Sequence, residues 1–179
     1  MMKGENTLEG DLTKQDRINE FGEVFTPPEL VNEVLNEVLE EEWKTPSAPW
    51  LDDCCGEGVW LMGVGKKLIE YGHSKTDVLS QMLYGVDIQK ANVIKCIENL
   101  HKAFGDGDDL NIEEVSVEEA QKQGYKGRKG IICLFSLNKK LLWHFACADS
   151  LEYQFKFGSE EDTNKNNIGK WSVQTVLSF

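Results

Sequence analysis

The sequence contains no apolar run that approaches the roughly 20 residues needed to cross a bilayer. Its polar first residues are not typical of a secretory signal peptide. The five cysteines include no C-x-x-C pair, so neither a zinc site nor a disulfide framework is indicated. These absences favour a protein of the reducing cytoplasm with no membrane segment and no metal site.

Positive charge is also scarce. Lysine and arginine total 19 residues against 31 aspartates and glutamates, which gives a net charge of −12. Such a charge repels phosphate backbones, so we do not expect this chain to bind DNA avidly by itself. One local basic cluster is present, and a solvated loop is its favoured interpretation; its members are Lys122, Lys126, Arg128 and Lys129.

The length of 179 residues and the 40% content of hydrophobic residues are typical of one soluble globular domain. The first 20 residues are polar and lack periodicity. We therefore predict a flexible arm over residues 1–20 and a single domain over residues 21–179.

Strand-like and helix-like apolar patterns alternate along this domain. Helices are predicted at 27–42, 59–71 and 89–104, and strands at 50–51, 83–88, 131–135, 141–147, 153–157 and 173–179. Residues 105–130 break the pattern and are expected to hold only one short helix, around 115–121. The alternation predicts an α/β fold with a mostly parallel sheet and helices on both faces.

The start of the first helix has a clear capping pattern. Thr26 can cap it, Pro27 suits its first position, and Glu29 completes a capping box. The glutamates at 40–42 are expected at its end, where they oppose the helix dipole.

Three predicted strands end in an acidic residue, namely Asp52, Asp87 and Asp149. Ligands of parallel sheets bind at the carboxyl ends of the strands. Gly56 and Gly58 follow the first strand and let the backbone approach a ligand closely. The turn is not the G-x-G-x-x-G fingerprint of dinucleotide sites, and carboxylates suit a cationic ligand with an amino group better than a pyrophosphate.

Four segments in order resemble the motifs of N6-adenine DNA methyltransferases. Residues Leu51–Leu61 resemble motif I, D-P-x-C-G-x-G-x-F-L, and Gly22–Pro27 resemble the F-T-P motif before it. Tyr84–Ile88 match motif II, Y-G-x-D-I, and Cys147–Leu151 match the motif III pattern, A/G-D-S/A-L after a strand. Motif I departs from the pattern at Asp53, where proline is usual.

The resemblance implies a Rossmann-like class I methyltransferase fold, truncated after the third or fourth strand, that binds S-adenosylmethionine. Carboxylates only accept hydrogen bonds, and each group that they would hold is a donor. The implied contacts are Phe25 and Thr26 to the methionine part; Asp52 and the turn with Cys55, Gly56 and Gly58 to the amino group and sulfur region; Asp87 to the ribose hydroxyls; Asp149 to the adenine amino group; and Ile88 to the face of the adenine ring.

Several of these residues could instead serve local structure. Asp87 could cap the helix that follows it, Asp149 could cap a turn through Ser150, and Phe25 to Pro27 could simply begin a helix. Cys54 and Cys55 are interpreted as small buried residues rather than nucleophiles.

The catalytic motif of the family, D/N-P-P-Y/F after the fourth strand, has no counterpart, because the four prolines all lie at or before Pro49. No catalytic residue is therefore assigned. One hypothesis is a methyltransferase of a restriction-modification or phage-like system that reaches DNA through a partner subunit supplying catalytic or recognition elements. The alternative is a non-catalytic protein that binds S-adenosylmethionine or serves as an interaction surface.

Overall fold

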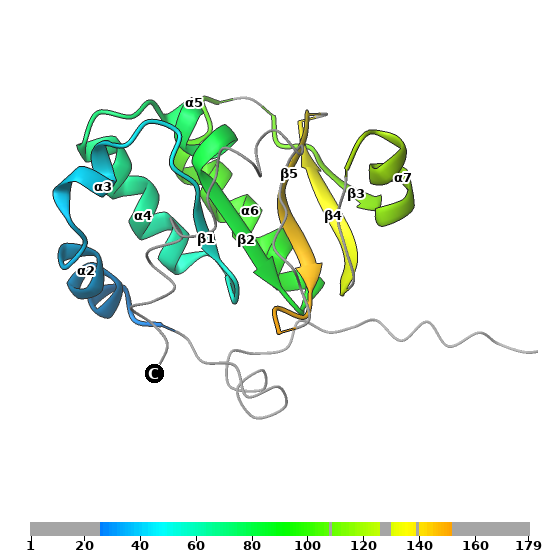
Figure 1. Cartoon of the computed structure of the whole chain (residues 1–179), viewed down its shortest axis with the longest axis horizontal. Helices are drawn as coiled ribbons and strands as arrows, with labels where there is room; N and C mark the ends of the chain where they lie inside the picture. The colour runs from blue at the N-terminus through cyan, green and yellow to red at the C-terminus, as the bar shows by residue number, and fades with distance from the viewer. Residues whose placement is uncertain (1–25, 108, 126–129, 139, 152–179) are drawn as a thin grey trace, which may run out of the picture.

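The computed structural model describes residues 26–107, 109–125, 130–138 and 140–151 (Figure 1). These residues form an α/β fold around a five-stranded sheet with the strand order β1-β2-β5-β4-β3. No helix in this part of the chain is long and apolar enough to cross a membrane. The predicted arm at residues 1–20, Phe25, and the predicted strands at 153–157 and 173–179 lie outside the described residues.

The sheet has a parallel half and an antiparallel half. Strands β1 (Trp50–Asp52), β2 (Leu83–Asp87) and β5 (Lys140–Ala148) run parallel to one another. Strand β4 (Ile131–Leu137) is antiparallel to β5, and β3 (Ile112–Ser116) is antiparallel to β4. The predicted α/β class is confirmed, and the sheet is mixed rather than parallel throughout.

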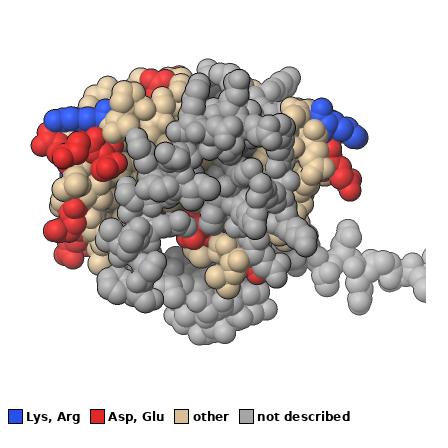
Figure 2. All heavy atoms as spheres, in the orientation of Figure 1, with Lys and Arg blue, Asp and Glu red and all other residues tan. Residues whose placement is uncertain are grey.

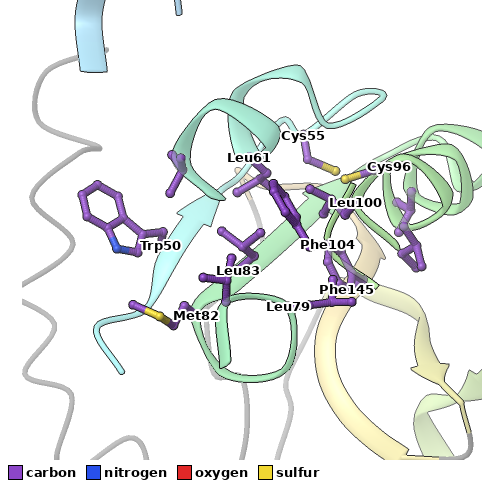
Figure 3. Packing of buried hydrophobic residues seen from close by; sticks show 14 of the residues in the cluster. Trp50, Cys55, Leu61, Leu79, Met82, Leu83, Cys96, Leu100, Phe104 and Phe145 are labelled. Atoms are coloured by element: carbon purple, nitrogen blue, oxygen red, sulfur yellow. The ribbon is translucent and has the colours of Figure 1, made fainter. Parts of the chain in front are cut away.

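Two long helices cover one face of this sheet. They are α4 (Val59–Glu70) and α6 (Lys90–Phe104), and their buried side chains share one core cluster with Leu83 and Phe145 of the sheet (Figure 3). Helix α2 (Pro28–Asn36) packs against α4. The short helix α5 (Lys75–Asp77) continues into a π-helical turn, η1 (Val78–Met82), which leads into β2.

A smaller apolar cluster lies on the opposite face of the sheet. Helix α7 (Val117–Lys122) contributes Ala120 to it, and Val86 and Ala146 come from β2 and β5. Alternate residues of β2 and β5 thus enter different clusters, as the two-residue period of a strand requires. Helices therefore lie on both faces, with α7 as the one helix of the described chain on this second face.

The predicted first helix is two helices. Helix α2 begins at Pro28 with Pro27 as its N-cap, no side chain caps it, and it ends at Asn36. Helix α3 (Glu40–Lys44) follows, so the three glutamates begin this helix, where they complement its dipole, and do not end the previous one. The break allows buried Trp43 to stack on Trp50 of β1, with ring centroids 4.5 Å apart.

Strand β3 lies in the segment predicted to hold only a short helix, so that prediction is wrong there. Glu113 and Glu114 are exposed on it, and Val115 is its one buried residue. Charged side chains are common on strands at a sheet edge because they discourage further pairing. Its composition therefore resembles a solvated loop more than a strand.

Candidate functional site

The three acidic strand ends lie along one edge of the sheet. In the register of the parallel strands, Asp52 pairs with Gly85 and Asp87 pairs with Cys147, while Asp149 comes directly after the last residue of β5. The arrowheads of β1, β2 and β5 point toward the same lower edge in Figure 1. This placement is the one that the sequence predicted.

The glycine turn after β1 is held against the end of β2. The Cys55 N–H donates to the carbonyl of Val86 at 2.8 Å, and the Gly58 N–H donates to the carbonyl of Cys55 at 2.8 Å. Gly56 and Gly58 have φ angles of +48° and +86°. Residues with a Cβ atom rarely adopt this region of backbone conformation. A Cβ on Gly58 would also lie 2.7 Å from Sγ of Cys96.

The Asp87 carboxylate joins the glycine turn to the start of α6. Its Oδ2 accepts the N–H of Gly56 at 3.0 Å, and its Oδ1 accepts the N–H of Gln89 at 2.8 Å and Nδ2 of Asn92 at 3.4 Å. Gln89 is the N-cap of α6, so Asp87 is not itself the capping residue. These contacts use three of the roughly four lone-pair positions of a carboxylate, which leaves room for one more donor on Oδ2.

Asp52 is an acid whose environment disfavours its charge. Burial raises the pKa of the Asp52 carboxyl from 3.8 to about 7, and the nearby charges of Asp53 and Asp87 act in the same direction. The N–H of Cys54, 3.2 Å from Oδ1, opposes this effect. At neutral pH the Asp52 carboxyl therefore exchanges readily between its neutral and its charged form.

This pKa predicts how stability depends on pH. In the unfolded chain Asp52 ionises near its ordinary value, whereas the folded chain holds the proton up to about pH 7, so stability falls as pH rises between these values and then levels off. We expect Asp52→Asn to stabilise the protein at about pH 8 by up to about 4 kcal/mol, the equivalent of a shift of about three pKa units, and to have no such effect below about pH 4. Urea unfolding at the two pH values measures the difference.

The control for this experiment is Asp109→Asn, which removes an exposed carboxylate of the same type. It changes the net charge equally and lies outside the strand edge, so its effect on the free energy of unfolding should be small at both pH values. A stabilisation by Asp52→Asn that is equal at both pH values would contradict the burial of this charge.

The turn after β5 lies next to the turn after β1. The Leu151 N–H donates to Oδ1 of Asp149 at 3.0 Å, so this carboxylate caps a turn through Ser150, which is one of the two roles that the sequence allows it. Oγ of Ser150 lies 3.8 Å from Sγ of Cys54. The two turns thus meet across the end of β2, and Asp149 remains part of the edge.

The two adjacent cysteines differ in environment. Cys55 is buried, as predicted, and its thiol has a pKa raised well above the ordinary range by a hydrogen bond with Cys96 and by burial. Cys54 is exposed, so the prediction that it is buried is wrong, although partial burial also raises the pKa of its thiol. Both thiols are therefore weak nucleophiles at neutral pH.

The remaining candidates are an apolar side chain at the edge and a residue beside α2. Ile88 follows Asp87 and is 61% exposed, so an apolar side chain faces outward next to the acids. Thr26 is exposed before α2, and no hydrogen bond among the described contacts joins it to the edge. The structure brings together seven of the nine predicted residues: Asp52, Cys55, Gly56, Gly58, Asp87, Ile88 and Asp149.

Two asparagines of α6 also contact this region and were not predicted. Asn92 lies beside Asp87, and Nδ2 of Asn99 donates to the carbonyl of Glu57 at 2.9 Å. They are seven positions apart on a helix, which places them on the same face. The sequence signal that could have identified them is a pair of polar residues at this spacing on a helix face whose other residues are buried.

Comparison with known proteins finds a similarity in sequence. The chain is 25% identical, over 189 aligned positions, to a protein of Mycoplasma pneumoniae described as an uncharacterized adenine-specific methylase. The alignment covers 87% of this chain and 44% of that protein, so the chain spans less than half the length of its relative. No family model and no solved structure matches the chain. The similarity supports a relationship to a methyltransferase.

Proposed function

We propose that this chain binds S-adenosylmethionine at the edge formed by β1, β2 and β5, as part of a methyltransferase that acts on adenine in DNA. The observation that carries the proposal is the convergence of Asp52, Asp87, Asp149 and the glycine turn at one sheet edge. The similarity to a protein described as an adenine-specific methylase supports it independently.

The chemistry of the edge fits this cofactor. S-adenosylmethionine carries a sulfonium cation, an amino group, two ribose hydroxyls and an adenine amino group, and ionised carboxylates accept hydrogen bonds from such donors. Asp52 and the turn would hold the charged amino-acid end, Asp87 a ribose hydroxyl, and Asp149 the adenine amino group. Ile88 would contact the face of the adenine ring. When bound, the cofactor supplies the methyl group.

Calorimetry on the purified chain tests the proposal. We expect S-adenosylmethionine and S-adenosylhomocysteine to bind with dissociation constants in the micromolar range, roughly −8 kcal/mol. ATP shares the adenosine part but carries phosphates that the carboxylates repel, so it should bind far more weakly. Absence of binding by both adenosyl compounds, or equal binding of ATP, would overturn the proposal.

Methyl transfer to DNA by the purified chain alone is expected to be low or absent. Extruding a base from the duplex costs a few kcal/mol, which a pocket with hydrogen bonds and aromatic contacts must offset. The sequence has no proline after Pro49, so the usual acceptor motif is lacking, and we propose that a partner subunit supplies this pocket.

The surface charge also disfavours DNA methylation by the chain alone. Exposed glutamates gather over α2 and α3, at the left of Figure 2, and they repel the phosphate backbone. Transfer of a tritiated methyl group to DNA measures the activity, and calorimetry of the same sample verifies that cofactor binding is intact. Robust labelling of DNA by the chain alone would contradict the need for a partner.

A further inference from the structure

Helix α6 presents a row of three side chains to the candidate site. Asn92, Cys96 and Asn99 are spaced by four and three residues, so they lie along one face of the helix. All three contact either the glycine turn or the Asp87 carboxylate.

Asn99 anchors the middle of the glycine turn. Its Nδ2 donates to the carbonyl of Glu57 at 2.9 Å, across 42 positions in the sequence. Glu57 stands between two glycines with positive φ, where the backbone has the greatest conformational freedom. The Asn99 amide therefore restrains the part of the turn that is otherwise easiest to move.

The other two residues of the row, Asn92 and Cys96, contact the Asp87 carboxylate and the glycine turn, respectively. Asn92 is only 4% exposed, and its Nδ2 lies 3.4 Å from Oδ1 of Asp87. Cys96 is fully buried and fills the space beside Gly58, and its sulfur faces that of Cys55 (Figure 3). The row thus supports the carboxylate at one end and the turn at the other.

We infer that α6 sets the geometry of the cofactor site through two positioning residues, Asn99 for the glycine turn and Asn92 for the Asp87 carboxylate. The inference rests on the proposed function for the identity of the ligand. Because the turn would hold the amino-acid end and Asp87 the ribose, the two asparagines should influence different parts of the same molecule.

Two ligands separate these effects. S-adenosylhomocysteine contains both the amino-acid end and the ribose, whereas 5′-methylthioadenosine lacks the amino and carboxyl groups. Loss of the Asn99 donor should lower affinity for S-adenosylhomocysteine about fivefold and leave 5′-methylthioadenosine unchanged. Asn92→Ala should lower affinity for both ligands by a similar factor.

Asn99→Ala and Asn99→Asp test the Asn99 contact by calorimetry. Aspartate keeps the shape of the side chain but cannot donate to the Glu57 carbonyl, so both variants should behave alike. The matched control is Glu98→Ala, on the same helix but exposed and paired with Lys95 at the surface. Equal losses for both ligands in the Asn99 variants would indicate a general structural effect and overturn the division of roles.

Hydrogen exchange without ligand tests the positioning by itself. Amides of residues 55–58 should exchange faster in both Asn99 variants than in wild type or Glu98→Ala. If wild type binds neither adenosyl ligand, the proposed function fails, while faster exchange still supports the role of Asn99 in the turn. Unchanged exchange together with unchanged affinity would overturn the inference even if wild type binds the cofactor well.

Discussion

Replacing Asp87 by alanine is expected to weaken S-adenosylmethionine binding by roughly 30- to 100-fold, on the order of 2 to 3 kcal/mol. The substitution removes the charged acceptor proposed for a ribose hydroxyl. It also releases the Gly56 N–H, which donates to Oδ2 at 3.0 Å, so the glycine turn keeps only the bond from the Cys55 N–H to the Val86 carbonyl among its described hydrogen bonds to the end of β2. Calorimetry of wild type and variant measures the loss.

Two further variants show whether this effect belongs to the site. Asp106→Ala removes an exposed carboxylate just beyond the end of α6, where it accepts a hydrogen bond from Thr76, and it should leave affinity unchanged. Asp87→Asn keeps one acceptor oxygen without the charge and should fall between wild type and alanine. Equal affinity of wild type and Asp87→Ala would remove Asp87 from the cofactor site.

The second large effect is expected at Gly58. Gly58→Ala should lower the free energy of unfolding by about 3 kcal/mol, because two penalties add. The φ angle of +86° strains any residue with a Cβ, and that Cβ would lie 2.7 Å from Sγ of Cys96. Chemical denaturation at neutral pH measures the change, with the slope used to check for two-state unfolding.

Gly72 provides a matched control for the backbone penalty. Its φ angle is +97° and nothing lies within 4 Å of a Cβ built on it, so Gly72→Ala should cost only about 1 kcal/mol. A double-mutant cycle with Cys96→Ala then isolates the contact, because removing the sulfur should bring the cost of Gly58→Ala close to that of Gly72→Ala. If the sulfur makes no difference, crowding at Cys96 is not the cause.

The elements that position the site could be predicted because their patterns are strong and local. The short apolar strand of Trp50 and Leu51 leads into an acidic residue and then a glycine turn. The strand ending at Asp87 is followed by a long amphipathic helix. Each strand end could be located within a residue or so, and the parallel arrangement then places the acids at one edge.

The antiparallel pairing of β4 and β5 could have been predicted from the short connection between them. Strands β4 and β5 are joined by residues 138–139 alone, and parallel neighbours need a crossover of a dozen or more residues. Asn138 has a φ angle of +50°, as suits a tight hairpin turn. The apolar pattern locates both strands, but it carries no information on their direction relative to each other.

Other features depend on tertiary contacts and have no local signal. The break between α2 and α3 allows Trp43 of a helix to stack on Trp50 of a strand, and the apolar pattern of the segment does not predict this contact. The hydrogen bond of Asn99 joins positions 42 apart, and an asparagine in a helix predicts no partner on its own. Tertiary packing determines these features, and the secondary-structure propensity of each segment does not.

The glycine turn has a consequence for the entropy of ligand binding. Glycine loses more conformational freedom on ordering than any other residue, and a loop with two glycines would ordinarily lose that freedom when a ligand arrives. Here hydrogen bonds from the turn to Val86 and Asp87, and from Asn99 to Glu57, order it in the folded protein beforehand. Binding at this edge therefore starts from a preorganised backbone, and less of the contact free energy is lost to ordering the turn.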